Sequence, residues 1–232
     1  MNYQRYAGQS TYGVRPAPAL VQQLLVGAFG WMFAGLLLTA GVSYLTATST
    51  AITQAAVSLW LPLLIGQFVL VMVISAGINR LSPMASLALF FVYSATMGLT
   101  IGVIVLAYKW PSVAIAFVSS AAMFGAAAVY GRVTNRDLSH IGSIMIMALF
   151  GIIIASLLNL FFNSTGLNWI ISIAGVAIFA VLTAWDVQRI VNGQLATLVK
   201  SAERATVLAA LHLYLDFINL FLFMLRLFGD RR

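Results

Sequence analysis

The sequence contains no cysteine and very little charge. Charged residues make up 7% of the 232 residues, against roughly 25% in an ordinary soluble domain. Without cysteine the chain has no disulfide, no thiolate metal site and no thiol redox couple. Acidic residues are the scarcest charged class, with five in all, and there are only two histidines. These absences exclude a soluble globular domain, a disulfide-rich scaffold and a charge-rich disordered chain.

Apolar side chains are what the sequence has in abundance. They account for 62% of the residues, and the mean hydropathy is +1.02, which leaves an integral membrane protein as the expected class. A barrel would show alternating segments of about ten residues, whereas this chain has long continuous apolar runs. We therefore predict an all-α membrane protein, a seven-transmembrane-helix bundle. The spans, each near the required length of about 20 residues, are 20–46, 55–79, 84–108, 111–131, 140–163, 168–189 and 205–228.

The chain divides into a tail and one membrane domain. Residues 1–19 are polar and end in two closely spaced prolines, which predicts a flexible cytoplasmic tail before a seven-helix transmembrane domain over 20–232. The first apolar run is as long as a membrane span and has no small-residue cleavage site after it. We therefore expect no cleaved signal peptide.

Two local patterns predict how the helices pack and end. Gly98-x-x-x-Gly102 provides the small residues that let membrane helices approach closely. The connection 190–204 begins with Asn192-Gly193, which is typical of a helix stop. Its scattered apolar residues suit a short helix at the membrane interface.

The basic residues carry information about orientation. The net charge is +7, but the basic residues lie at the ends of the apolar runs, so we interpret them as topology and headgroup contacts and expect no nucleic acid partner. A cytoplasmic N-terminus places eight basic residues inside and four outside, which favours that orientation. The basic C-terminus disagrees, and a re-entrant final stretch would return it to the cytoplasm.

Two of the five acids lie within predicted spans, where an ionisable side chain marks a functional site by default. Asp186 is near the end of the sixth span and Asp216 in the middle of the seventh. The alternatives are an interfacial Asp186 paired with Arg189 and a protonated, packed Asp216. His212, Asp216 and Asn219 share one helix face, which predicts that this face points inward and that the C-terminal helix is central.

Two further residues have a functional and a simpler interpretation. Arg80 ends the second span and is either a snorkelling topology charge or a guanidinium that faces the carboxylate pair and latches helices together. His212 is either part of the polar site or a satisfied packing residue.

Three segments together resemble the transmembrane Bax inhibitor motif family, from about Trp31 to the C-terminus, and the last segment is the most specific. The compact C-terminus is similar to bacterial inner-membrane members, which implies that location. The segments are Thr134-Asn135-Arg136-Asp137-Leu138-Ser139, Thr183-x-x-Asp186-x-Gln188 and Leu213-Tyr214-Leu215-Asp216-Phe217-Ile218-Asn219-Leu220-Phe221.

The resemblance implies a fold and an activity. The family fold has two three-helix layers around the final helix, and the activity is a pH-sensitive calcium leak controlled by aspartates on helices six and seven. In this sequence those residues are Asp186 and Asp216. An arginine of the second helix is expected to latch the closed state, and Arg80 is the matching candidate.

The leading hypothesis is therefore a pH-sensitive calcium (cation) leak channel or transporter, gated by Asp186 and Asp216 with Arg80 as the candidate latch. Two carboxylates in one low-dielectric site do not both ionise cheaply, so they titrate as a unit. They also offer the oxygen ligands that calcium prefers, which makes the pair the expected metal site, with Thr183, His212 and Asn219 as supporting polar residues. We expect calcium as a weakly bound, transported ion and no tightly bound cofactor.

Two other classes remain as alternatives. One is a non-conducting regulator that binds a membrane protease or another membrane protein within the bilayer. The other is an enzyme, which we do not expect. The Gly-x-Gly-Asp motif of intramembrane aspartyl proteases is absent, the final span has no lysine for retinal, and the two histidines lie on different segments.

Overall fold

The computed structural model describes residues 17–199 and 201–231. Most of the predicted tail, 1–16, lies outside the described residues. Seven of the helices are long and apolar enough to cross a membrane, so the predicted all-α membrane bundle is confirmed. In chain order the helices are α1 (Pro18–Thr48), α2 (Thr50–Ser58), α3 (Trp60–Gly77), α4 (Pro83–Leu106), α5 (Trp110–Val133), α6 (Ser139–Phe162), α7 (Thr165–Val191), α8 (Gln194–Leu198) and α9 (Ala202–Phe228).

The second span differs from its prediction at the N-terminal end. The predicted span began at residue 55, but residues 55–58 belong to the short helix α2, and α3 begins at Trp60. Pro62 explains the break, because its ring clashes with the carbonyl of Ser58 four residues earlier in a continuous helix. The membrane-spanning part is therefore shorter than predicted.

The connection after α7 contains the helix end and the short helix that its sequence predicts. Helix α7 ends at Val191, and Gly193 adopts a left-handed backbone with φ of 67°, which glycine accepts without strain. The short helix α8 follows at once.

The turn before α6 is held by a side-chain hydrogen bond, in which the backbone N–H of Ser139 donates to the Asp137 carboxylate at 2.9 Å. That hydrogen bond lowers the pKa of Asp137.

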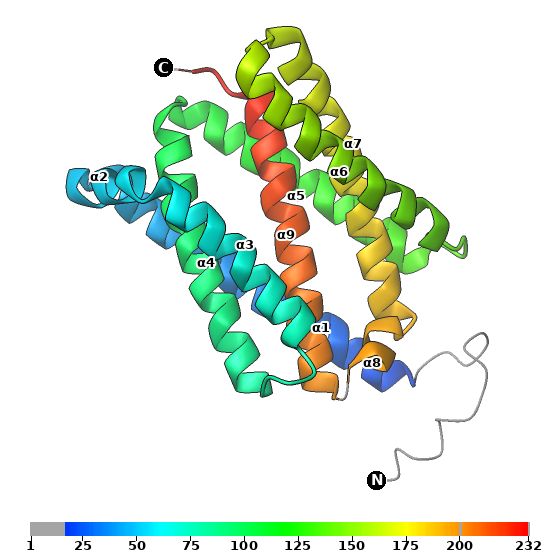
Figure 1. Ribbon diagram of the computed structural model, residues 1–232. Helices are drawn as coiled ribbons and strands as arrows, with labels where there is room; N and C mark the ends of the chain where they lie inside the picture. The colour runs from blue at the N-terminus through cyan, green and yellow to red at the C-terminus, as the bar shows by residue number, and fades with distance from the viewer. Residues whose placement is uncertain (1–16, 200, 232) are drawn as a thin grey trace.

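Helix α9 is the most buried of the seven spans. Within the most apolar part of each span, 78% of α9 is buried, against 56% of α7 and 11% of α3 and α6. Two groups of three spans flank it, α1 with α3 and α4, and α5 with α6 and α7 (Figure 1). Direct contacts to α9 come from α1, α4, α5 and α7, whereas α3 and α6 pack on α4 and α7. Enclosure of α9 by all six other spans stays a prediction.

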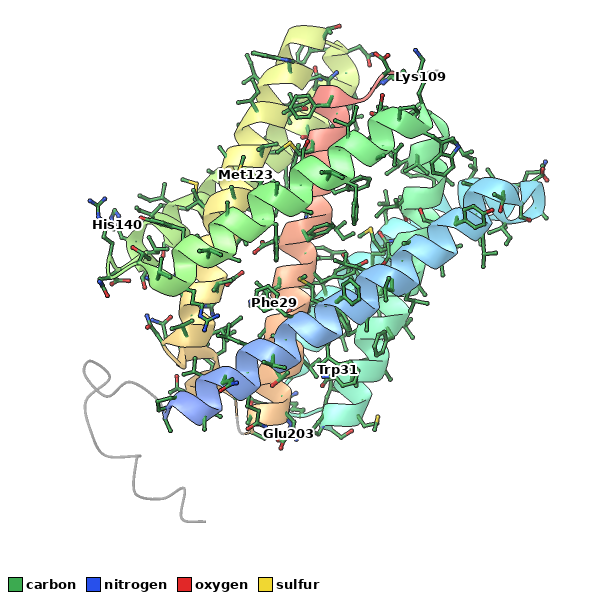
Figure 2. All side chains as sticks on the ribbon, turned by 180° about the vertical axis from the view of Figure 1, so that it is seen from behind. Phe29, Trp31, Lys109, Met123, His140 and Glu203 are labelled. Atoms are coloured by element: carbon green, nitrogen blue, oxygen red, sulfur yellow. The ribbon has the colours of Figure 1, made fainter. Side chains whose placement is uncertain are left out.

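The two ends of the bundle are closed by different contacts. At one end, the Arg204 guanidinium Nε donates to the carbonyl of Leu81 at 2.9 Å, which ties the start of α9 to the α3–α4 turn. At the other end, Lys109 Nζ lies 3.2 Å from the Asp230 carboxylate. Glu203 and Lys109 accordingly mark opposite ends of the molecule (Figure 2). The C-terminal residues therefore rest on the α4–α5 connection.

Helices α1 and α4 pack closely through the predicted glycine pair. A Cβ atom at Gly98 would lie 2.7 Å from Val42 Cβ, and one at Gly102 would lie 2.5 Å from Thr46 Cβ. Only glycine therefore fits at these two positions without displacing α1. The predicted role of Gly98-x-x-x-Gly102 in close helix packing is thus seen between α4 and α1.

Candidate functional site

A large cavity of about 1290 Å³ runs beside α7 and α9. Its lining follows α7 from Thr165, the first residue of that helix, to Arg189 near its last turn. The remaining wall comes from α3, α4 and α6. At about 1.5 Å of rise per residue, this stretch of α7 is long enough to cross the apolar core of a bilayer. The cavity therefore extends from near one end of the bundle to near the other.

Asp186 lies in this cavity and is paired with a cation on its own helix. Its Oδ1 atom is 2.9 Å from Nη1 of Arg189, one turn further along α7. The Asp186 residue is only 7% exposed. Arg189 also lies over the Trp185 ring, with its Cζ 4.7 Å from the ring centroid, and this contact helps to orient the guanidinium. The alternative interpretation of Asp186, a carboxylate paired with Arg189, is therefore present in the structure.

Asp216 faces Asp186 from α9, and among the residues that the structure describes no cation forms an ion pair with it. The two carboxylates are close enough for their charges to interact directly, and the Thr183 hydroxyl lies beside the Asp216 carboxyl. Asp216 is 4% exposed, and its Oδ2 atom is buried with no hydrogen-bond partner among the residues that the structure describes. A buried carboxyl oxygen without a partner is costly. This atom is therefore free to accept a proton or to bind a cation.

The register of α7 and α9 explains how the two aspartates meet. Asp186 is five residues before the end of α7, or about 7 Å. It faces His212, which is ten residues into α9, or about 15 Å. About the first one and a half turns of α9, or roughly 8 Å, therefore extend beyond the end of α7. Without this offset, Asp216 would lie much deeper in the membrane than Asp186.

The supporting polar residues gather at the same place. His212 Nδ1 is 3.6 Å from Asp186 Oδ1, and this nitrogen has no hydrogen-bond partner among the described residues. Asn219 lines the cavity and donates to the carbonyl of Leu215 at 2.8 Å. The Thr183 hydroxyl donates to the Phe179 carbonyl on its own helix at 2.7 Å. The structure thus brings Thr183 and His212 to the aspartates, and Asn219 lines the same cavity about one turn from Asp216 on α9.

Arg80 is not part of this cluster. It lies in the turn after α3, where it is exposed, and it does not line the cavity. In the part of the chain that the structure describes, no ion pair joins Arg80 to either aspartate. Arg189 occupies the place that the latch hypothesis gave to Arg80. A latch by Arg80 stays a prediction.

The sequence did not single out Gln188 as a functional residue. Its Oε1 atom accepts from the backbone N–H of Leu138 at 2.9 Å, and its Nε2 atom donates to the carbonyl of Arg136 at 2.7 Å. The side chain therefore fixes the α5–α6 connection to α7, two residues from Asp186. The feature of the sequence that could have indicated this role is its position, because Gln188 is an uncharged polar residue of a membrane span close to Asp186 and Arg189.

The donor set of the site limits which metal it binds. Within residues 17–199 and 201–231, no three His, Asp or Glu side chains are placed so that together they could hold a metal ion. Two carboxylates, a hydroxyl and water offer oxygen ligands, which suit a weakly held divalent cation better than a tightly bound one. At the far end of α9, Arg226 and Arg231 also line the cavity and add positive charge to its other end.

Comparison with known proteins shows the family of the chain. A model of the family described as inhibitor of apoptosis-promoting Bax1 matches residues 21–232. The chain belongs to this Bax inhibitor family. The predicted resemblance to that family is therefore confirmed.

Several bacterial relatives of this Bax inhibitor chain match it over nearly their whole length. The inner membrane protein YbhL of Escherichia coli K12 is 43% identical over 225 residues, which cover 94% of this chain and 96% of the relative. A relative from Deinococcus radiodurans is 43% identical over 91% of this chain and 92% of its own. A relative from Borreliella burgdorferi is 43% identical over 90% of this chain and 93% of its own length.

The family motifs of this Bax inhibitor chain meet in three dimensions. The segment between α5 and α6 is bonded to α7 through Gln188, and α7 carries Asp186. The motif of α9 carries Asp216, whose charge interacts with that of Asp186. Segments that are far apart in the sequence therefore meet at α7.

Proposed function

We propose that this Bax inhibitor family protein is a pH-sensitive cation leak, with calcium as the permeating ion. The observation that carries the proposal is the pair of buried carboxylates, Asp186 and Asp216, on adjacent helices beside a cavity that follows the length of α7. Buried carboxylates in a membrane protein that face a cavity are typical of ion and proton pathways. A site with few protein ligands also releases its ion readily, as conduction requires.

Arg189 and the aspartates together supply the gate. While Asp186 is ionised, its ion pair with Arg189 holds the charge of this end of the cavity near neutral. Arginine remains protonated at physiological pH, so the carboxylates are the groups that change charge. Protonation of the aspartates weakens the contact between Asp186 and Arg189 and so loosens this end of the cavity. It also removes the negative charge that attracts a cation. Acid therefore has two opposing effects on flux.

We propose that the N-terminus is cytoplasmic and that the membrane is the bacterial inner membrane. The inner membrane protein YbhL supports the location. Five basic residues of the described chain lie at the end where α7 stops, and three lie at the opposite end, so the positive-inside rule favours the first end as cytoplasmic. They are Arg80, Arg132, Arg136, Arg189 and Arg204 against Lys109, Arg226 and Arg231.

The test is calcium flux into proteoliposomes that contain the purified protein, measured with an entrapped calcium dye across pH. We expect a pH-dependent leak in the wild type and a flux with no such dependence in Asp216→Asn. Asn168→Asp provides a control, because it adds a carboxylate elsewhere in the same cavity and keeps the original pair. No flux above empty liposomes from correctly oriented wild type would contradict the proposal and favour the non-conducting regulator.

A further inference from the structure

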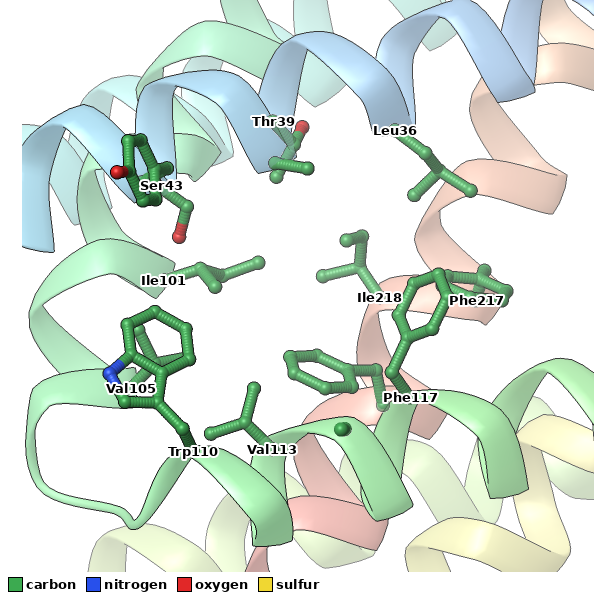
Figure 3. A pocket seen from close by; sticks show the side chains of 14 residues that line it. Leu36, Thr39, Ser43, Ile101, Val105, Trp110, Val113, Phe117, Phe217 and Ile218 are labelled. Atoms are coloured by element: carbon green, nitrogen blue, oxygen red, sulfur yellow. The ribbon is translucent and has the colours of Figure 1, made fainter.

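A second, smaller cavity of about 400 Å³ lies on another face of α9. It is enclosed by α1, α4, α5 and α9, and its walls are almost entirely apolar (Figure 3). Phe217, Ile218 and Phe221 of α9 form its inner wall. None of its lining residues belongs to the aspartate cavity. It is therefore a separate site, and its volume is within the range of small-molecule pockets.

One polar atom in this cavity has no partner. The Ser43 hydroxyl oxygen points into the cavity (Figure 3), and it is buried without a hydrogen bond among the described residues. Ser43 is 8% exposed. The neighbouring hydroxyl of Thr39 is satisfied, because it lies 2.6 Å from the Tyr214 hydroxyl. A buried, unpaired hydroxyl in an apolar cavity indicates a ligand with one hydrogen-bond acceptor on an apolar body.

The rim of the cavity has the chemistry of a membrane interface. Tyr44 and Trp110 line it near the ends of their helices, and both residue types concentrate at the headgroup level of bilayers. Lys109, next to Trp110, is exposed although it pairs with Asp230, and Arg231 lies over the Tyr108 ring. These groups give a net positive charge beside the rim, which complements a phosphate.

The opposite end of the cavity reaches into the apolar core of the bundle. Leu36 lies eight residues before Tyr44 on α1, which corresponds to about 12 Å along the helix. Ala40 and Ala114 line the cavity and are exposed. In a membrane, these side chains face lipid, so the cavity opens sideways to the bilayer between α1 and α5.

We infer that this cavity binds one acyl chain of an anionic glycerophospholipid from the leaflet at the α4–α5 end. The chain lies against Phe217 and Ile218, the ester carbonyl accepts a hydrogen bond from the Ser43 hydroxyl, and the phosphate lies near Lys109. Among the described residues, Ser43 Oγ is the only buried polar side-chain atom of the cavity wall without a hydrogen-bond partner, and the ester carbonyl gives it one. This site is independent of whether the protein conducts ions.

The test uses the full-length protein in bilayers that contain phosphatidylglycerol with a photoactivatable diazirine in the middle of one acyl chain. After illumination, peptide mass spectrometry locates the attached lipid. We expect adducts on Ile101 and Ile218, which are 5% and 3% exposed and which lipid outside the cavity does not reach. Ala114→Phe, which fills the cavity from an exposed position, should reduce these adducts at least fivefold. Ala122→Phe, on an exposed part of α5 outside the cavity, should leave them unchanged.

Substitutions of Ser43 test the proposed hydrogen bond to the lipid separately. Loss of one hydrogen bond in Ser43→Ala should reduce the adducts on Ile218 about fivefold, and Ser43→Thr, which keeps a hydroxyl, should retain them. Adducts confined to outward side chains such as Ile115 in the wild type, or equal labelling of Ile218 in Ala114→Phe, would overturn the inference. Efficient disulfide formation between two copies of Ala40→Cys, with no label inside the cavity, would instead assign the cavity to a second copy of the chain.

Discussion

Asp186 and Arg189 form an ion pair within a single helix, with 2.9 Å between Oδ1 and Nη1. The charge of Asp186 is therefore balanced by a cation of α7 itself, and His212 of α9 lies 3.6 Å from the same oxygen. Asp216, on α9, faces the same pair with an unpartnered oxygen. From this asymmetry we expect the two aspartates to have different roles. Asp186 orients Arg189, and Asp216 has an oxygen without a hydrogen-bond partner among the described residues.

The first prediction compares the two candidate latch arginines. Arg189→Ala removes a charged hydrogen bond worth about 1.5–3 kcal/mol, which corresponds to at least roughly tenfold in the ratio of closed to open protein. We expect it to raise basal calcium leak and flatten the pH profile in proteoliposomes. Arg80→Ala is the matched control, and we expect a smaller effect because Arg80 is exposed in the turn after α3. A larger effect from Arg80→Ala would restore the latch hypothesis for that residue.

The second prediction concerns the distance between the aspartates. The chain has no cysteine, so a variant with Asp186→Cys and Asp216→Cys contains only the introduced pair. We expect a short bifunctional reagent to crosslink these positions rapidly, seen as a shift in electrophoretic mobility after cleavage between α7 and α9. A pair at 183 and 226, at distant levels of α7 and α9, is the control. Absence of the crosslink in both acid and alkali would contradict a shared site.

The third prediction concerns the hydroxyl pair that joins α1 to α9. Thr39 Oγ1 lies 2.6 Å from the Tyr214 hydroxyl, and Tyr214 is fully buried. Tyr214→Phe should lower stability by about 1 kcal/mol, which corresponds to a decrease of about 2–4 °C in Tm. Thermal unfolding in detergent measures this change. The same substitution at Tyr130, which is 48% exposed, should have little effect, and equal losses at both positions would refute the role of the hydrogen bond.

The fourth prediction concerns close packing between α1 and α4. A methyl group at Gly98 would lie 2.8 Å from the Thr39 carbonyl oxygen, which belongs to the backbone and cannot move aside easily. Gly98→Ala should therefore destabilise the protein by about 1–3 kcal/mol. Gly125→Ala has open space around it and should be neutral or slightly stabilising, because alanine favours the helix. Retention of detergent-stable monomer on heating separates the two outcomes.

The sequence predicted the seven spans because apolar length alone decides which segments cross a membrane. It also predicted the face shared by His212, Asp216 and Asn219, since helical spacing requires only local geometry. It placed the start of the second span too early, because the apolar run continues through Pro62 whereas the helix is interrupted before it. The helix boundary at Leu59 is the visible result.

The partner of Asp186 was harder to predict. Arg189 and Arg80 were both suitable cations, and only tertiary structure decides which one reaches the carboxylate. The vertical offset between α7 and α9 also depends on the connection between them, whose length does not determine where α9 begins relative to α7. The cavity at Ser43 had no signal in the sequence, because one serine in an apolar helix is common and its missing partner is a property of the folded bundle.

The burial of α9 has a consequence for biosynthesis. This helix follows the other six spans in the chain, so it leaves the ribosome after them, yet it is the span with the largest buried share. Until α9 inserts, the surfaces of α1, α4, α5 and α7 that contact it must be covered by lipid or by the insertion machinery. The six earlier spans therefore form an incomplete bundle in the membrane until α9 inserts. Maturation of the bundle is then a late step, and a nascent chain stalled before α9 would be the substrate of membrane quality control.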